Sequence, residues 1–129
     1  MKTHELKAAA ANYAQLIALF LLGVLFILAD WLSSFPPGSL YPQWDTAVHM
    51  IAGALLMITF TPYTSSTRSI LLAVFSIAVA FEIAEFFTTP LSDYGSTRAY
   101  VIDTILDISA AVVGAWAVHK LFFKRSPHD

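Results

Sequence analysis

The chain has 129 residues, of which 57% are hydrophobic and 12% charged, with a net charge of −2 and no cysteine. A typical soluble domain is about 25% charged, and short domains bury the smallest share of their surface, so this composition excludes a soluble globule. The lack of cysteine excludes disulfides and thiolate metal sites, and the lack of a basic field excludes nucleic acid as a partner. The composition therefore predicts an integral membrane protein whose few charged residues carry its function.

Four apolar segments follow one another along the chain. A spanning helix needs roughly 20 mostly apolar residues, and the second segment, which Pro62 closes, is near the lower limit. We therefore predict an all-α, four-helix transmembrane bundle in a single membrane domain over residues 1–129. The expected spans cover about residues 12–30, 44–61, 69–87 and 99–123.

The first apolar segment is either a signal peptide or a retained helix. Lys2 and Lys7 before it resemble the basic region of a signal peptide, but the apolar stretch is too long and no A-x-A cleavage site follows. We therefore expect a retained helix.

The link Trp31–Trp44 contains Pro36, Pro37 and Pro42, which forbid a continuous helix there.

Basic residues predict the orientation of the bundle. With four spans both termini lie on one side of the membrane, and Arg98 is the only basic residue on the other side. The positive-inside rule therefore places both termini in the cytoplasm. The basic residues on the side of the termini are Lys2, Lys7, Arg68, Lys120, Lys124 and Arg125.

Six ionisable residues lie inside or at the edges of the last three spans, as three pairs that each share one helix face. At about 1.5 Å rise per residue, all six fall in the outer half of a hydrocarbon core about 30 Å thick. We therefore expect the deeper members to converge in the bundle interior. The pairs are Asp45 with His49, Glu82 with Glu85, and Asp103 with Asp107.

The charges of this layer do not balance, because five carboxyl groups face one certain cation, Arg98. Unpaired charge at membrane depth costs several kcal/mol, so the layer is protonated, hydrated or bound to a cation. Carboxylates with one imidazole suit Mn, Fe or Zn, and all-oxygen subsets of the layer suit Mg or Ca, which makes a divalent metal the candidate cofactor. The candidate metal ligands are His49, Glu82, Glu85, Asp103 and Asp107, of which His49, Glu82 and Asp107 are also candidate catalytic residues. The candidate headgroup-binding residues are Asp45, Glu85, Arg98 and Asp103, with Arg98 most simply paired to Glu85 or Asp103.

Simpler interpretations stay open for single members of the layer. Asp45 and Asp103 also suit helix N-caps or first-turn acids, which the helix dipole favours. His49 alone also suits a hydrogen-bonded bundle residue. Glu82 and Asp107 lie well inside their spans, where an acidic side chain usually has a function.

Three stretches, WDTAVHMIAG, FEIAEFF and RAYVIDTILDISAAVVGA, resemble the motifs of VanZ-like membrane proteins. That family has an Asp-x-x-x-His step on one helix and a Glu-x-x-Gln or Glu-x-x-Glu step on the next. After an exposed loop an Arg is followed by Asp-x-x-x-Asn and a Gly. The resemblance covers about Trp44–Gly114 and implies a small helical bundle with a role in the cell envelope. Thr46, Glu85 and Asp107 depart from the residues common in the family, and all three changes make the site more negative.

Three classes of function follow from the layer. The first is binding of an envelope precursor or a lipid headgroup, or a role as an accessory subunit of a larger membrane complex. The second is a metal-dependent enzyme that acts on a lipid-linked substrate at the outer leaflet, with metal-activated water and Arg98 on a phosphate. The sequence does not decide between them. Ion translocation ranks lowest, because the inner half of the bundle offers few polar residues.

Overall fold

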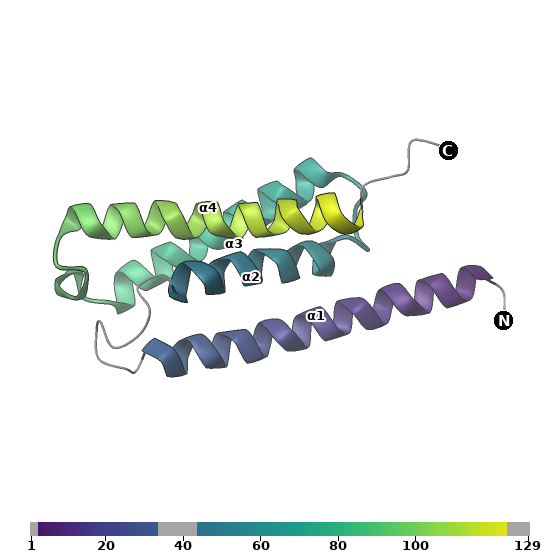
Figure 1. Ribbon diagram of the computed structural model, residues 1–129, viewed down its shortest axis with the longest axis horizontal. Helices are drawn as coiled ribbons and strands as arrows, with labels where there is room; N and C mark the ends of the chain where they lie inside the picture. Colours follow the sequence, from purple (N-terminus) through teal and green to yellow (C-terminus); the bar gives the residue numbers. More distant parts are fainter. Residues whose placement is uncertain (1–2, 34–43, 124–129) are drawn as a thin grey trace.

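The computed structural model describes residues 3–33 and 44–123, which are almost entirely helical (Figure 1). Within these ranges there is no strand, so the all-α fold with four main helices is confirmed. The elements are α1 (Thr3–Ser33), α2 (Trp44–Phe60), α3 (Thr67–Thr88), the short 3₁₀ helix η1 (Leu91–Tyr94) and α4 (Thr97–Phe122).

Three helices are long and apolar enough to cross a membrane. The apolar stretches are Ala9–Leu32 in α1, Thr67–Thr88 and Thr97–Phe122. Helix α2 has 17 residues, which at 1.5 Å per residue gives about 26 Å, slightly less than a hydrocarbon core of about 30 Å. Large apolar side chains stay exposed along the helices, such as Phe20 of α1 at 70% and Phe87 of α3 at 79%. The chain is therefore a small integral membrane protein whose apolar surface faces lipid.

The helix ends differ from the expected spans mainly at α1. This helix begins at Thr3, well before residue 12, and continues through Trp31 to Ser33. The helix-breaking part of the first link is thus shorter than expected, and its prolines lie in 34–43, outside the described residues. The other ends have local causes. The side chains of Ser66 and Ser96 accept hydrogen bonds from the backbone N–H groups three residues later, at the starts of α3 and α4.

The helices alternate in direction, so that their ends gather at two ends of the molecule (Figure 1). Helices α2 and α4 begin where α1 and α3 finish, and we call this the Trp44 end. The opposite end holds the start of α1 at Thr3 and the end of α4 at Phe122, as a four-span bundle requires. Helix α2 packs most extensively on α4, α1 packs on α2, and α3 packs on α4.

Helices α2 and α4 are the most closely packed pair, because a glycine on each helix lets the two backbones approach. A Cβ atom added to Gly53 of α2 would overlap the backbone carbonyl of Ala111, and one added to Gly114 of α4 would overlap that of Met50. The two backbones are therefore in direct contact, as small residues allow in membrane bundles. The apolar core continues from here toward the end opposite Trp44 and is centred on Met57, Val74, Ala78, Ala111 and Ala115.

Candidate metal and headgroup site

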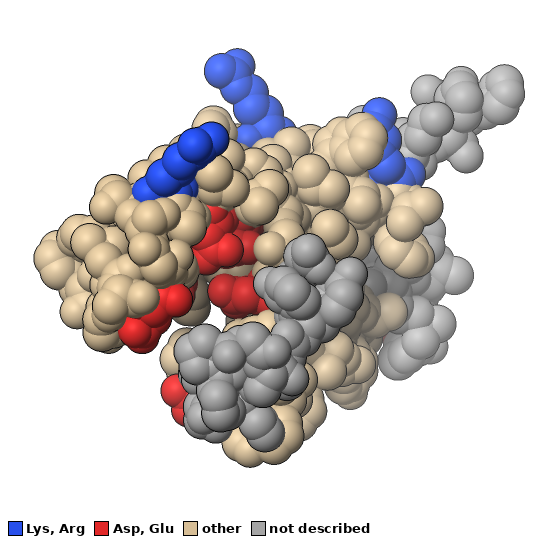
Figure 2. Space-filling view, turned by 60° about the vertical axis from the view of Figure 1, so that its left-hand side comes forward, with Lys and Arg blue, Asp and Glu red and all other residues tan. Residues whose placement is uncertain are grey.

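The three pairs of ionisable residues come from three different helices and lie near the Trp44 end. Each pair occupies one face of its helix, because residues three or four apart lie above one another on a helix. Acidic side chains surround a hollow in this end of the molecule (Figure 2). The pairs are Asp45 and His49 on α2, Glu82 and Glu85 on α3, and Asp103 and Asp107 on α4.

His49 is at the centre of this group. Its side chain is buried, and its Nε2 atom lies 3.8 Å from Oδ1 of Asp45 and 3.7 Å from Oε1 of Glu82. The ring of Phe81 meets the imidazole edge to face, with 5.5 Å between the ring centroids. Both distances from Nε2 exceed a good hydrogen bond of 2.7–3.2 Å. The imidazole is therefore held between two carboxylates without being fully bonded to either.

Two carboxylates of the group are buried and incompletely bonded. Asp107 is 1% exposed and Glu82 is 5% exposed. Within the part of the chain that the structure describes, Oδ1 of Asp107, Oε1 of Glu82 and Oγ1 of Thr104 have no hydrogen-bond partner. Buried charged groups are normally paired or bound to a metal, and an unsatisfied one costs several kcal/mol. The carboxylates of Asp107 and Glu82 are thus incompletely satisfied between α2, α3 and α4.

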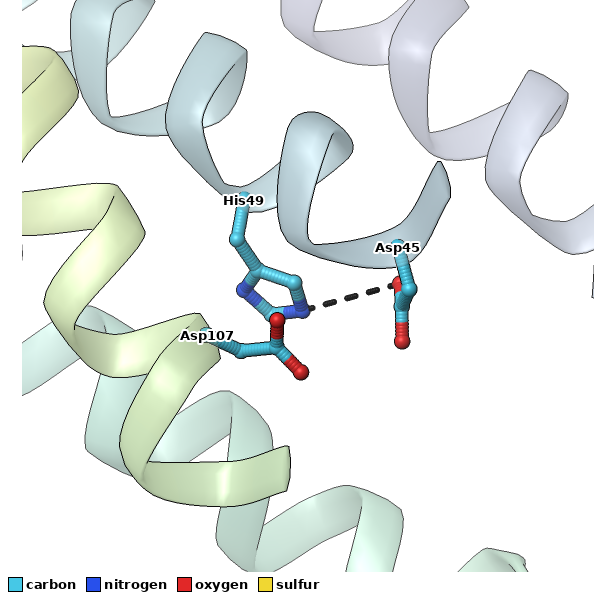
Figure 3. Close-up of side chains that lie close together, drawn as sticks. All are labelled: Asp45, His49 and Asp107. Atoms are coloured by element: carbon cyan, nitrogen blue, oxygen red, sulfur yellow. Dashed lines mark ion pairs between the residues drawn. The ribbon is translucent and has the colours of Figure 1, made fainter. Parts of the chain in front are cut away.

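The spacing of the ligand atoms suits a metal ion. Asp45, His49 and Asp107 offer one atom each within 4.8 Å of one another, and so do His49, Glu82 and Glu85. Ligands at about 2.1 Å from one metal are about 3–4 Å apart, so small side-chain movements would close either set around an ion. Figure 3 shows the side chains of Asp45 and His49 from α2 directed toward that of Asp107 from α4. His49 belongs to both sets.

Glu85 has a partner that the sequence did not indicate. The hydroxyl of Tyr94, in η1, donates a hydrogen bond of 2.6 Å to Oε1 of Glu85. Burial and this hydrogen bond raise the pKa of Tyr94 above its ordinary value, so the phenol remains a donor at physiological pH. Gly95, with φ at 73°, ends η1 in the left-handed conformation that turns the chain toward α4.

Two expected members of the site lie at its edge. Asp103 is half-buried and belongs to neither ligand set. Arg98 is exposed, and no ion pair within the described ranges joins it to Glu85 or Asp103. The expected pairing of Arg98 is therefore not formed. Arg98 lies five residues before Asp103, in the first turn of α4.

Thr104 was also missed by sequence reasoning, although a signal for it exists. It lies three residues before Asp107 on α4, and therefore on the same helix face. Tyr94 had no comparable signal, because its position depends on how the loop between α3 and α4 folds back.

Comparison with known proteins adds no assignment to this geometry. The chain matches no family model, no curated protein and no solved structure. The likeness to VanZ-like proteins thus stays a prediction that rests on three short motifs. What can be said of function depends on the group around His49.

Proposed function

We propose that this membrane protein binds a divalent cation between α2 and α4, and that the cation holds the anionic headgroup of a lipid or lipid-linked envelope precursor. Asp45, His49 and Asp107 are the protein ligands in this proposal. Glu82 and Glu85 stand beside them on α3. One imidazole with carboxylates suits Mn²⁺, Fe²⁺ or Zn²⁺.

The observation that carries the proposal is the burial of Asp107 without a partner for Oδ1. This carboxylate is 1% exposed, and the side chains of His49 and Asp45 lie beside it (Figure 3). No ion pair within the described residues joins it to an Arg or Lys. A cation is the partner that would satisfy both carboxylates and His49 at once. The open hollow at the Trp44 end leaves room for a ligand on the far side of the ion.

A metal-dependent enzyme is the second candidate, and the position of Glu82 favours it. This buried carboxylate lies 3.7 Å from Nε2 of His49 and has a free oxygen next to the proposed ion. A carboxylate in that position suits a general base for a metal-bound water, which would attack a phosphoryl or acyl group. Binding and catalysis share the same ion, so one measurement tests both.

We expect purified protein to retain a divalent metal, and Asp107→Asn to lose it. An amide is a much poorer ligand than a carboxylate, whereas in a protonated, metal-free network Asn would nearly mimic the native side chain. Elemental analysis after dialysis measures the difference. Asp93→Asn in the exposed η1 is the matched control and should retain the metal of the wild type. Metal-free wild type, with Asp107→Asn equally stable, would refute the metal proposal.

We also propose that the Trp44 end faces the exterior of the cell, as the distribution of basic residues predicts. The chain has no cysteine, so a single introduced cysteine reports its own side. A membrane-impermeant maleimide should label Ser92→Cys in intact cells and Ser65→Cys only after permeabilisation. Both serines are exposed, in η1 and in the α2–α3 turn respectively. Labelling of Ser65→Cys in intact cells would invert this orientation.

Membership of the VanZ-like family is a further part of the proposal. It is supported by the three motifs, since five of their six acidic and His residues belong to the two ligand sets: Asp45, His49, Glu82, Glu85 and Asp107. An envelope role and a bacterial plasma membrane follow from that resemblance alone.

A further inference from the structure

A cavity of about 210 Å³ lies between α1 and the other three helices. Its α1 wall consists of Leu22, Leu25, Phe26 and Ala29. These residues have the i, i+3, i+4, i+7 spacing of one helix face. Helix α1 packs mainly on α2, and Ile77, Ala78 and Phe81 of α3 also line the cavity.

The opposite wall combines small residues with larger apolar side chains such as Val48, Leu56 and Phe81. Ala52 and Gly53 of α2 and Ala78 of α3 line the cavity there. Small side chains at helix contacts normally let helices close up, as Gly53 does with α4. On the α1 side the same residues leave space instead. The result is a largely apolar space among the four helices.

One end of the cavity is polar. Asp45 and His49 line it, and both belong to the proposed metal-ligand set. A ligand that occupies the cavity therefore reaches the cation with one end and apolar walls with the other. Such a ligand is amphipathic, and a cation held by carboxylates selects an anionic oxygen at its polar end.

We propose that the cavity takes one hydrocarbon chain of a phospholipid whose phosphate is bound by the cation. The inference rests on the proposed function, because the cation supplies the attraction for the phosphate. Phosphate is the anionic group that lipids and free metabolites share, and the cavity is what separates the two sources. A lipid chain gains contacts in the cavity that a free phosphate ester lacks, so the lipid binds more tightly than its headgroup alone.

The test fills the cavity from its α1 wall without touching the ligand set. Ala29→Phe places a ring in the cavity, and Ala52→Leu fills it from α2 as a second variant. Ala14→Phe is the matched control, because Ala14 is exposed on the same helix and does not line the cavity. Native mass spectrometry of Mn²⁺-loaded protein in detergent measures binding of dioleoyl phosphatidic acid and of glycerol 3-phosphate.

We expect wild type and Ala14→Phe to bind phosphatidic acid at least tenfold more tightly than glycerol 3-phosphate. Ala29→Phe and Ala52→Leu should lose that advantage while they retain metal and glycerol 3-phosphate. Equal binding of the two probes by wild type, or unchanged lipid binding in both cavity variants, would overturn the inference. The proposed function would still stand in that case if the protein retained its metal. Loss of lipid binding in Ala14→Phe would likewise overturn it, because the effect would then not belong to the cavity. Failure of the proposed function is recognised separately, by wild-type protein that holds no metal.

Discussion

Gly53→Ala is expected to destabilise the bundle by about 3 kcal/mol, the upper end of the usual cost of overpacking. The added methyl group would overlap the backbone carbonyl of Ala111, and a backbone atom cannot rotate away as a side chain can. Helices α2 and α4 would have to separate, which also moves His49 away from Asp107. Thermal unfolding in detergent, followed by circular dichroism, measures the loss.

Gly23→Ala is the control for this prediction. Nothing lies within 4 Å of a Cβ added to Gly23 of α1. Alanine favours a helix over glycine by about 1 kcal/mol, so this variant should be neutral or slightly more stable than wild type. The same substitution is thus expected to destabilise the protein at Gly53 and not at Gly23. If Gly53→Ala were as stable as Gly23→Ala, the close contact between α2 and α4 would be wrong.

His49→Ala is expected to have the largest effect on metal binding. His49 belongs to both sets of candidate ligands, whereas every other ligand belongs to one. Mutation of a residue that only hydrogen-bonds to a metal ligand typically lowers metal affinity 10–100-fold. Loss of His49, which would itself bind the metal, should therefore lower it more than about 100-fold. Mn²⁺ affinity of the detergent-purified protein, measured by isothermal titration calorimetry, gives this ratio.

His119→Ala is the matched control, since His119 lies at the opposite end of the molecule. Its ring is 3.2 Å from the hydroxyl of Thr67, so it ties α4 to α3 far from the acidic group. We expect metal affinity to be unchanged in this variant. Glu85→Gln should fall between the two, because Glu85 belongs to one ligand set and also accepts the hydroxyl of Tyr94. Wild-type affinity in His49→Ala would exclude the group around His49 as the metal site.

The sequence by itself determined the class of the protein, its helices and the level of its charged layer. Long apolar runs must form helices in lipid, because backbone groups have no water to bond. Helical periodicity places Asp45 above His49 and Asp103 above Asp107, whatever the neighbouring helices do. Depth along each helix follows from the rise per residue, which is why the charges of three helices were expected at one level.

Only the tertiary structure decided which of these charges meet. Periodicity does not say how far a helix rotates about its own axis toward its neighbours. Asp103 and Asp107 are separated by only about 40° around α4, yet Asp107 is buried and Asp103 is half-buried. The contact of Gly53 with Ala111 sets that rotation for α2 and α4. Packing of α1 against distant helices opens the cavity beside it, and the fold of the α3–α4 loop places Tyr94 on Glu85. Neither feature follows from helical periodicity, because each depends on how two elements pack against each other.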